Sequence, residues 1–361
     1  MTAQQQRTFK PARILIFGIG DLGVHIARLV MENQYASVCM LAGQSSAAEQ
    51  WAALLNISTG GDTKATRVNG LNVEAVETLL TTFEPDVIVQ CATLLSPFAM
   101  AGVGTPAAIA ILKAGFALQA AAQLPIIRSV MQARRSIGLS CPVINCSYPD
   151  VTNVMLASEG LAPDAGIGNV AIMALRFQQL IPGAADGELR VIGHHSQLGP
   201  SLAGEPATAP TPVPLVYLGN RKLEEAELLL KPGLERGPTL NHLAAATVHP
   251  ILRGFLSQDS FTQTHAPGVF GLPGGYPIRF AGGRIALDLP KAVSIDEAIS
   301  FNNLSAVAEG IERIESDGTL VYTQAAKDEV APWCPELAEP LKLSGLDKRL
   351  ALLKAVIESR T

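Results

Sequence analysis

The sequence predicts an α/β fold with a doubly wound parallel sheet in the N-terminal half of the chain, and an α+β fold with a mostly antiparallel sheet in the C-terminal half. Short apolar runs alternate with helix-like segments over the first 160 residues, and a glycine cluster follows the first of these runs. After Asp150 the pattern changes to strands in short succession, joined by loops. The length of 361 residues therefore favours two domains, residues 1–160 and 161–361.

Composition and charge narrow the classes of protein to which this chain can belong. It is 48% hydrophobic and 16% charged, which is enough apolar material for a large core. The net charge is −5 and no run rich in lysine or arginine occurs, so we expect neither a nucleic-acid partner nor a membrane surface as partner. Residues 87–112 carry no charge, but prolines and glycines interrupt them, which predicts a buried strand, a loop and a helix instead of a membrane span.

The cysteines and the initial stretch predict a cytoplasmic location. There are five cysteines, an odd number, and no C-x-x-C motif occurs. We therefore expect reduced core residues, and neither a disulfide framework nor a metal site. The initial stretch, MTAQQQRTFKPA, is polar and lacks the apolar segment of a signal peptide.

Strands and helices alternate regularly in the first half. Strands this apolar, separated by helices, are typical of a parallel sheet that is covered on both faces. Around the fourth strand, for example, Pro85 and Asp86 interrupt the preceding helix, and Val87 begins a buried run. The predicted strands are residues 13–17, 37–42, 66–70, 86–92, 116–120 and 142–148, and the predicted helices are residues 21–33, 46–55, 73–83, 105–114 and 123–138.

The second half has longer loops between its elements. A proline-rich loop is predicted for residues 199–214, and a Gly/Pro-rich loop for residues 266–277. The final helix, residues 344–359, could return to pack on the first domain. The other predicted helices are residues 151–161, 221–230, 239–256 and 294–310, and the predicted strands are residues 169–177, 188–196, 213–220, 278–280 and 284–289.

The glycine cluster has the spacing G-x-G-x-x-G and lies between a predicted strand and a predicted amphipathic helix. Gly18 allows a tight turn, Gly20 lets the backbone approach a pyrophosphate, and Gly23 allows the helix to pack closely on the strand. The N–H groups and the positive dipole end of the helix then face the phosphates. A plain strand–turn–helix corner is the alternative. The βα units that follow favour a Rossmann domain, which would bind a dinucleotide through Gly18, Gly20, Asp21, Leu22 and Gly23.

The choice of dinucleotide depends on the end of the second strand, about 20 residues after the last glycine. An NAD site normally has an Asp or Glu there, which binds the ribose hydroxyls and repels a 2′-phosphate. No carboxylate occupies this place, and no arginine does either; the residues are Gly43, Gln44, Ser45 and Ser46. Because the serines could donate hydrogen bonds to a 2′-phosphate, NADP is preferred over NAD as the expected cofactor.

The stretches RILIFGIGDLG, LAGQSS and PDVIVQCAT together resemble the NAD(P)-binding half of the saccharopine dehydrogenase-like oxidoreductases. The resemblance covers residues 1–160 and implies that Cys91, Ala92 and Thr93, at the end of the fourth strand, lie near the cofactor. NCSYPDVTNVMLA is similar to the family's passage into its catalytic half, with Pro149-Asp150 in place of the usual Pro-Gly pair. The family includes dehydrogenases that make or break a C–N bond by reducing an imine, and members with no known reaction.

Hydride transfer to a carbonyl or imine needs a proton donor, and four residues are candidates. His194 and His195 end an apolar strand, where adjacent side chains point to opposite faces, so at most one of them is expected to reach a site. His265 lies beside the Gly/Pro-rich segment, which is either a binding loop or a turn-rich linker. Asp150 follows a parallel strand, where it could orient a histidine, act as a base or cap the next helix.

Substrate contacts are expected at two places. Tyr148 and Asn153 follow the carboxyl end of a parallel strand, which is the edge at which open α/β sheets bind ligands. Tyr276 could donate a proton and Arg279 could bind a carboxylate, although either could equally lie at a strand edge.

A short-chain dehydrogenase is excluded, because no tyrosine is followed by lysine at the fourth position after it.

The predicted function is that of an NAD(P)-dependent oxidoreductase, which transfers hydride between the cofactor and a small carbonyl or imine compound such as an amino or keto acid. The second domain is expected to supply substrate contacts and a homodimer interface. Two alternatives from other classes remain. One is a non-catalytic NAD(P)-binding sensor, and the other is a lyase or epimerase that uses NAD as a bound redox catalyst.

Overall fold

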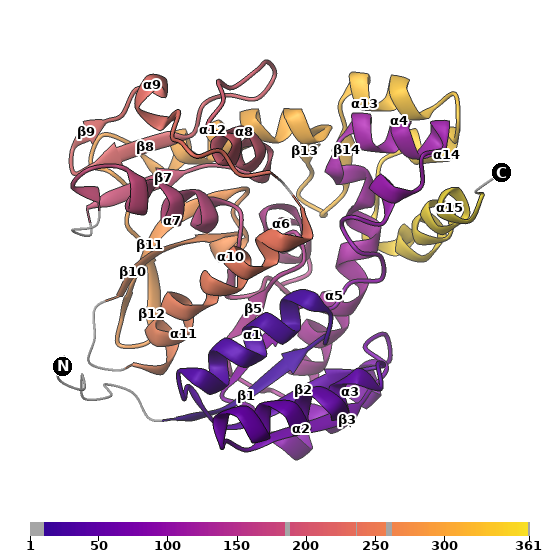
Figure 1. Ribbon diagram of the computed structural model, residues 1–361. Coiled ribbons are helices and arrows are strands. Elements are labelled where there is room, and N and C mark those ends of the chain that lie inside the picture. The colour runs from indigo at the N-terminus through magenta and orange to yellow at the C-terminus, as the bar shows by residue number, and fades with distance from the viewer. Residues whose placement is uncertain (1–10, 185–187, 236, 258–261, 360–361) are drawn as a thin grey trace.

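The computed structural model describes residues 11–184, 188–235, 237–257 and 262–359. Its N-terminal half is built on a six-stranded parallel sheet with the order β3-β2-β1-β4-β5-β6. This order is that of the dinucleotide-binding Rossmann sheet, so the predicted fold class is confirmed. Figure 1 labels β1, β2, β3 and β5 of this sheet. The strands are β1 (Ala12–Phe17), β2 (Ala36–Gly43), β3 (Thr63–Arg67), β4 (Val87–Gln90), β5 (Val143–Asn145) and β6 (Ala165–Gly166).

Helices cover both faces of this sheet because successive strand residues point to opposite sides. In β1, Leu15 and Phe17 belong to one hydrophobic core, whereas Ile14 and Ile16 belong to the other. The first core is completed by α3 and α5, and the second by α1 and α2. The helices of this half are α1 (Asp21–Glu32), α2 (Ala47–Thr59), α3 (Val73–Phe83), α4 (Pro106–Ala114), α5 (Ala120–Ser136) and α6 (Pro149–Ala157).

The beginnings of these helices have identifiable causes. The Asn72 side chain accepts a hydrogen bond from the Ala75 N–H and caps α3, whose Val76 and Leu80 are spaced to bury one face. Thr105 caps α4 in the same way, and Pro106 occupies its first position, where no N–H is needed. Local sequence therefore sets where α3 and α4 begin.

The second half contains three small antiparallel sheets among the described residues. Their orders are β7-β8-β9, β10-β11-β12 and β13-β14, and a bridge between Gly193 and Gly275 joins β7 to β11. The mostly antiparallel character is therefore confirmed. The strands are β7 (Leu189–Ile192), β8 (Leu215–Leu218), β9 (Arg221–Lys222), β10 (Thr262–Pro267), β11 (Gly275–Ala281), β12 (Arg284–Leu287), β13 (Ile311–Ile314) and β14 (Leu320–Tyr322).

The helices of the second half pack on these sheets and on the Rossmann half. Val248, Ile251 and Leu252 of α11 join the same hydrophobic core as α1. The helices are α7 (Val170–Leu180), α8 (Leu198–Ala203), α9 (Glu225–Leu228), α10 (Asn241–Ala246), α11 (Val248–Leu256), α12 (Ile295–Ala306), α13 (Gln324–Val330), α14 (Pro335–Ala338) and α15 (Leu346–Glu358).

Two apolar runs that the sequence predicts as strands are helical. Residues 116–120 form a 3-10 helix, Phe116–Gln119, and the first residue of α5. Residues 169–177 fall almost entirely in α7, which is buried on nearly every side. A continuous apolar run does not distinguish a buried strand from a buried helix, and here the run forms a helix that packs against β7 and β10.

Several other boundaries differ from the prediction. The third strand lies three residues earlier, at Thr63–Arg67. The predicted helix at 221–230 is β9 followed by the single turn of α9, and the predicted loop at 199–214 begins inside α8. Strands β10 and β11 occupy both ends of the predicted loop at 266–277, so His265 lies in a strand. The sequence analysis does not predict β13, β14, α13 or α14.

The C-terminal segment returns to the first half of the chain. Helix α13 packs against α4, and α15 packs against α5 (Figure 1). Leu346 and Leu353 of α15 belong to the same hydrophobic core as α5, and Arg128 of α5 donates a hydrogen bond to the Leu343 carbonyl (3.3 Å). Strand β6 lies after residue 160 and extends the parallel sheet, so the second half contributes an edge strand to this sheet. Both halves also contribute side chains to one hydrophobic core.

None of the described helices is by itself long and apolar enough to cross a membrane. One pair, Pro106–Ala114 with Phe116–Ser136, meets the criteria of length and composition together, with a bend of 112° between its members.

Candidate functional site

A cavity of about 710 Å³ opens at the carboxyl edge of the parallel sheet. Its walls come from both halves of the chain: the glycine turn, Cys91 after β4, Cys146 after β5, Asn169 before α7 and His195 after β7. Strands β1 and β4 are neighbours while their connections lead to opposite sides, which is the switch point where such sheets bind ligands. The volume lies in the range of about 300–1,000 Å³ that is usual for ligand pockets.

Gly18 and Gly23 have the backbone roles that the sequence predicts for them, and Gly20 borders the cavity. Gly18 has φ = 103°, and a Cβ there would lie 2.5 Å from the Ala92 nitrogen. A Cβ on Gly23 would lie 2.0 Å from the Gly18 oxygen, so helix α1 can approach the strand only without one. A Cβ on Gly20, in contrast, would meet no atom within 4 Å, because Gly20 borders the cavity. The position of Gly20 leaves room for a ligand to reach the backbone.

The N-terminus of α1 faces the cavity without a side-chain cap. Gly20 is the N-cap residue, and Gly20, Asp21, Leu22 and Gly23 all line the cavity. Asn241 of α10 donates a hydrogen bond to the Asp21 carboxylate (2.8 Å), so α10 closes over this end of the cavity. N–H groups at a helix N-terminus bind anions well, and these residues fit a dinucleotide pyrophosphate.

The end of β2 lies outside this cavity, on the exposed side of the turn. Gly43 is buried and lies close to Gly18, whereas Gln44, Ser45 and Ser46 are exposed. Gly43 pairs with Arg67, the last residue of β3, whose guanidinium lies 3.4 Å from the Glu49 carboxylate. No arginine is predicted here because Arg67 comes from the next strand. The signal that could have indicated Arg67 is that neighbouring parallel strands end at a common edge of the sheet.

A histidine–carboxylate pair forms the wall of the cavity opposite the turn. His195 Nδ1 lies 2.8 Å from Glu309 Oε1, and the Tyr148 hydroxyl donates a hydrogen bond to Glu309 Oε2 (3.4 Å). The rings of Phe116, Tyr148 and His195 pack together, with centroids 4.7 to 5.4 Å apart. His195 and Tyr148 are predicted site residues that the structure brings together. Glu309 is not predicted, because no local motif marks it.

Asp150 holds the histidine from behind and does not line the cavity. Its carboxylate accepts hydrogen bonds from the backbone N–H of His195 (3.1 Å) and from the Asn169 side chain. Asp150 is fully buried in the first turn of α6, directly after Pro149, so it is not the N-cap residue. Its contacts suit an orienting group for the turn that carries His195.

Two residues of the cavity wall have strained backbones. Tyr148 has φ = 50° and Asn169 has φ = 46°, in the region that favours glycine. Such conformations cost about 1–3 kcal/mol each and persist where the surroundings determine them, often at functional sites. Both strained residues contact the His195–Glu309 group, through the tyrosine hydroxyl and through Asp150.

The other predicted catalytic histidines do not line the cavity. His194 is buried, its Nδ1 accepts a hydrogen bond from the Ser196 N–H (3.3 Å), and burial lowers its pKa. His265 lies in β10, where its Nε2 accepts a hydrogen bond from the Val191 N–H (2.9 Å). Burial, with a smaller effect of Arg190, lowers the pKa of His265 to about 3. Burial therefore favours the neutral form of both histidines.

The remaining predicted substrate residues also lie away from the cavity. Asn153 donates a hydrogen bond to the Gly268 carbonyl (3.1 Å) and joins α6 to the segment after β10. The Tyr276 hydroxyl donates to the Pro273 carbonyl (2.7 Å), and burial raises the pKa of this phenol well above its usual range. Arg279 lies in β11, half-exposed, with its guanidinium 3.8 Å from Asp288.

The predicted cofactor contacts after β4 are placed next to the turn. Cys91 and Thr93 line the cavity, and the Ala92 N–H donates a hydrogen bond to the Phe17 carbonyl (3.0 Å) under Gly18. Within the described residues, no three His, Cys, Asp or Glu side chains gather so as to hold a metal ion.

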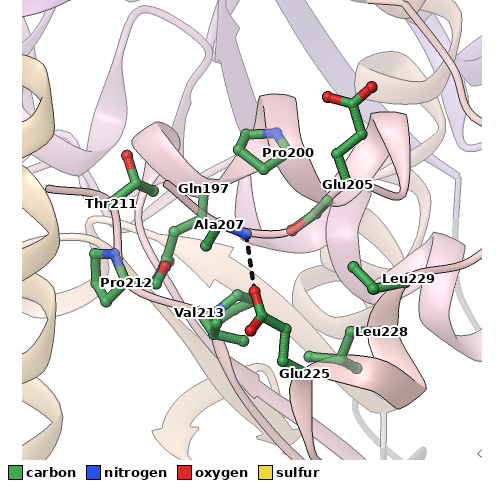
Figure 2. Close-up of a pocket in the computed structure, with 12 residues that line it drawn as sticks. Gln197, Pro200, Glu205, Ala207, Thr211, Pro212, Val213, Glu225, Leu228 and Leu229 are labelled. Atoms are coloured by element: carbon green, nitrogen blue, oxygen red, sulfur yellow. Dashed lines mark hydrogen bonds between the residues drawn. The ribbon is translucent and has the colours of Figure 1, made fainter. Parts of the chain in front are cut away.

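A second pocket is too small to be the site. Figure 2 shows it between α8 and α9, where the Ala207 N–H donates a hydrogen bond to Glu225 (2.8 Å). Its volume of about 20 Å³ is room for about one water molecule.

Comparisons with known proteins concern the fold. No protein-family model matches the chain, and no curated protein matches it significantly. Among solved structures, the lactate dehydrogenase MGS-M5 from a Medee basin deep-sea metagenome library has 13% identity and a TM-score of 0.49, over 89% of this chain and 99% of that one. The minor L-lactate dehydrogenase of Enterococcus mundtii has 13% identity and a TM-score of 0.46, over 83% of this chain and 96% of that one.

Proposed function

We propose that the protein is an NAD(P)-dependent oxidoreductase that transfers hydride between the cofactor and a small carbonyl or imine compound. The observation that carries the proposal is that the His195–Glu309 pair and the glycine turn open into one cavity at the switch point of the sheet. A nicotinamide cofactor bound there would supply or accept the hydride. The residues of this chain would then bind the cofactor, position the substrate and move the proton.

His195 is the proposed proton donor in the reducing direction. Glu309 accepts a hydrogen bond from Nδ1 and so orients the ring, which leaves Nε2 to exchange a proton with the substrate oxygen or nitrogen. Asp150 holds the backbone of the same residue. The packing of Phe116 and Tyr148 around the imidazole limits the access of water to the pair.

Two further residues support a carboxylate-bearing substrate, such as a keto acid or its imine. Gln119 is 2% exposed and lines the cavity, and no hydrogen bond among the described residues involves its side chain. A buried amide of this kind stabilises a ligand that supplies the missing partner. Lys113 is exposed at the cavity and is the one lysine or arginine among the described lining residues. Its ammonium group is suited to a substrate carboxylate.

NADP is the proposed cofactor, with NAD as the second choice. Ser45 and Ser46 are exposed at the end of β2, and Arg67 ends the adjacent strand. A guanidinium and two hydroxyls are suitable donors for a 2′-phosphate, whereas residues 43–46 include no carboxylate for the ribose hydroxyls of NAD. The resemblance to the saccharopine dehydrogenase-like family agrees with this class of cofactor. A homodimeric assembly is part of the same proposal.

A substrate screen tests the reaction. NADPH and NADH are offered with keto acids, with and without amines, and the loss of reduced cofactor is followed by its near-ultraviolet absorbance. His195→Gln is expected to lower kcat about 10²- to 10⁴-fold with little change in cofactor affinity, since general acid catalysis contributes about that factor. His249→Gln, which lies outside the cavity, is the control.

The same screen separates the alternatives. Tight cofactor binding without turnover of any substrate class would favour a sensor. Turnover of substrate without net change in the cofactor would favour a lyase or epimerase. An unchanged kcat in His195→Gln would overturn the assignment of the proton donor.

A further inference from the structure

Two cysteines meet on the floor of the cavity. Cys91 follows β4 and Cys146 follows β5, and their sulfur atoms lie 3.5 Å apart. Both are free thiols, both are half-buried and both line the cavity. Cys39 and Cys141 are buried, and Cys334 lies in the C-terminal segment. The proposed hydride transfer uses none of these thiols.

The backbone around the pair suits a disulfide. Gln90 and Asn145 are partners in the parallel register of β4 and β5, and each cysteine is the next residue along its strand. Neighbouring strands lie about 4.8 Å apart, within the roughly 4.4–6.8 Å between Cα atoms that a disulfide requires. A sulfur–sulfur bond is about 2 Å long, so the sulfurs must approach by about 1.5 Å from 3.5 Å. Rotation about the side-chain bonds can supply that movement.

Hydrogen bonds already tie the two strand ends together. The Cys146 N–H donates to the Gln90 carbonyl (2.8 Å), and the Ser147 hydroxyl donates to the Ala92 carbonyl (3.1 Å). The Gln90 side chain, fully buried, donates to the same Ala92 carbonyl (2.6 Å). Because these bonds hold the backbone in place, the thiols stay close to each other without cofactor or substrate.

We propose that Cys91 and Cys146 are a reversible redox modification site, which a peroxide converts to a disulfide and a dithiol restores. One thiolate attacks a peroxide oxygen, breaks the O–O bond and becomes a sulfenic acid, with release of one water molecule after protonation. The second thiol displaces the hydroxyl of the sulfenic acid as a second water molecule, and the S–S bond forms. The two thiols lose two electrons and two protons in total, and hydrogen peroxide becomes two water molecules.

The two thiols have different roles in this reaction. Burial, strengthened by the contact with Cys91, raises the pKa of the Cys146 thiol. The attack on the peroxide requires a thiolate, and the raised pKa disfavours this form at Cys146.

The disulfide is expected to weaken cofactor binding, and this consequence rests on the proposed function. The Cβ of Cys91 lies 3.8 Å from the position of a Cβ on Gly23, directly below the start of α1. Cross-linking the strand ends changes the floor against which a dinucleotide would lie. Linkage requires that bound cofactor disfavour the disulfide by the same factor by which the disulfide weakens binding. A coupling of roughly 5- to 150-fold is typical between sites.

The experiment counts thiols in the full-length protein before and after hydrogen peroxide. We expect the free thiols of the denatured chain to fall from five to three, since one pair forms, and dithiothreitol to restore all five. Peptide mapping by mass spectrometry should find the cross-link between the peptides of Cys91 and Cys146. The variants Cys91→Ser and Cys146→Ser should form no disulfide, whereas Cys141→Ser, at a buried site elsewhere, should still lose two thiols.

Several results would overturn the proposal. These are five thiols that persist under peroxide, a cross-link between other cysteines, and a loss of thiols that dithiothreitol does not reverse. A disulfide that leaves the Kd of NADPH and NADH unchanged would overturn the coupling. If the reduced protein binds neither NADPH nor NADH, the proposed function is overturned instead. The thiol count tests the disulfide independently, because it does not require cofactor binding.

Discussion

Replacing Glu309 with glutamine removes a negative charge from the pair with His195 and keeps the length of the side chain. Glu309 is 6% exposed, its Oε1 lies 2.8 Å from His195 Nδ1, and its Oε2 lies 3.4 Å from the Tyr148 hydroxyl. A hydrogen bond to a charged group contributes about 1.5–3 kcal/mol. At about 1.4 kcal/mol for each factor of ten, its loss corresponds to a fall in kcat/KM of roughly 10- to 150-fold.

The assay follows oxidation of the reduced cofactor with the substrate that the screen identifies. Because Glu309 acts through His195, kcat is expected to fall and the pH dependence of kcat/KM to change, while the Kd of the cofactor stays the same. Glu309→Asp keeps the charge and should retain more activity than Glu309→Gln. Glu312→Gln is the matched control, since Glu312 is exposed on β13 and pairs with Arg313 outside the cavity.

The stability of the same variant tests whether the role is structural. Removal of one partner of a buried charged pair is destabilising, so the thermal midpoint is expected to fall, and kcat is compared at a temperature at which both proteins are folded. If Glu309→Gln keeps kcat and the pH profile of the wild type, the reasoning about the proton donor is refuted. A fall in activity that only follows a lower thermal midpoint would refute it as well.

Three further predictions concern the cofactor turn, the adenosine end and the fold. Gly20→Ala is expected to weaken dinucleotide binding, because the added Cβ would point into the space for the ligand. Its thermal stability should not change, since this Cβ would meet no atom within 4 Å. Gly23→Ala should instead unfold at a lower temperature, because its Cβ would lie 2.0 Å from the Gly18 oxygen. Arg67→Ala is expected to raise the Kd of NADPH about tenfold, since one charged hydrogen bond is lost, and to leave the Kd of NADH unchanged. Equal effects on both Kd values would contradict the proposal that Arg67 binds the 2′-phosphate. His265 has a pKa of about 3 when folded, against about 6.5 in the unfolded chain, so from pH 6.5 to pH 5 the unfolded histidine gains about half a proton and the native state loses about 1.6 kcal/mol of stability. Urea unfolding at both pH values checks this, and a His265→Gln variant with the same dependence would contradict it.

The Rossmann half follows from local features of the chain. Apolar runs, the G-x-G-x-x-G spacing and the helix caps act over a few residues, so the order of strands and helices and the position of the turn can be read before any tertiary contact is known. The roles of Gly18, Gly20 and Gly23 also follow, because they depend on the absence of a Cβ in a short segment.

Predictions for the second half of the chain are wrong where one local sequence pattern is compatible with two kinds of secondary structure. Residues 169–177 are apolar enough for a buried strand, yet packing between β7 and β10 makes them the helix α7. The glycines and prolines near His265 suggest a loop, yet β10 and β11 pair across them and hold the imidazole in the interior. Tertiary packing decides between the options because it overrides local propensity.

The opening strand–turn–helix and the class of ligand expected for it follow from the order of residues, whereas the chemistry of the cavity does not. His195 and Glu309 are 114 residues apart, and Cys91 and Cys146 are 55 apart. No local pattern records that these atoms lie within 3.5 Å of each other. The first pair depends on the packing of the C-terminal half against the sheet edge, and the second on the register of two parallel strands. Both arise from long-range contacts, which form only when the whole chain is folded.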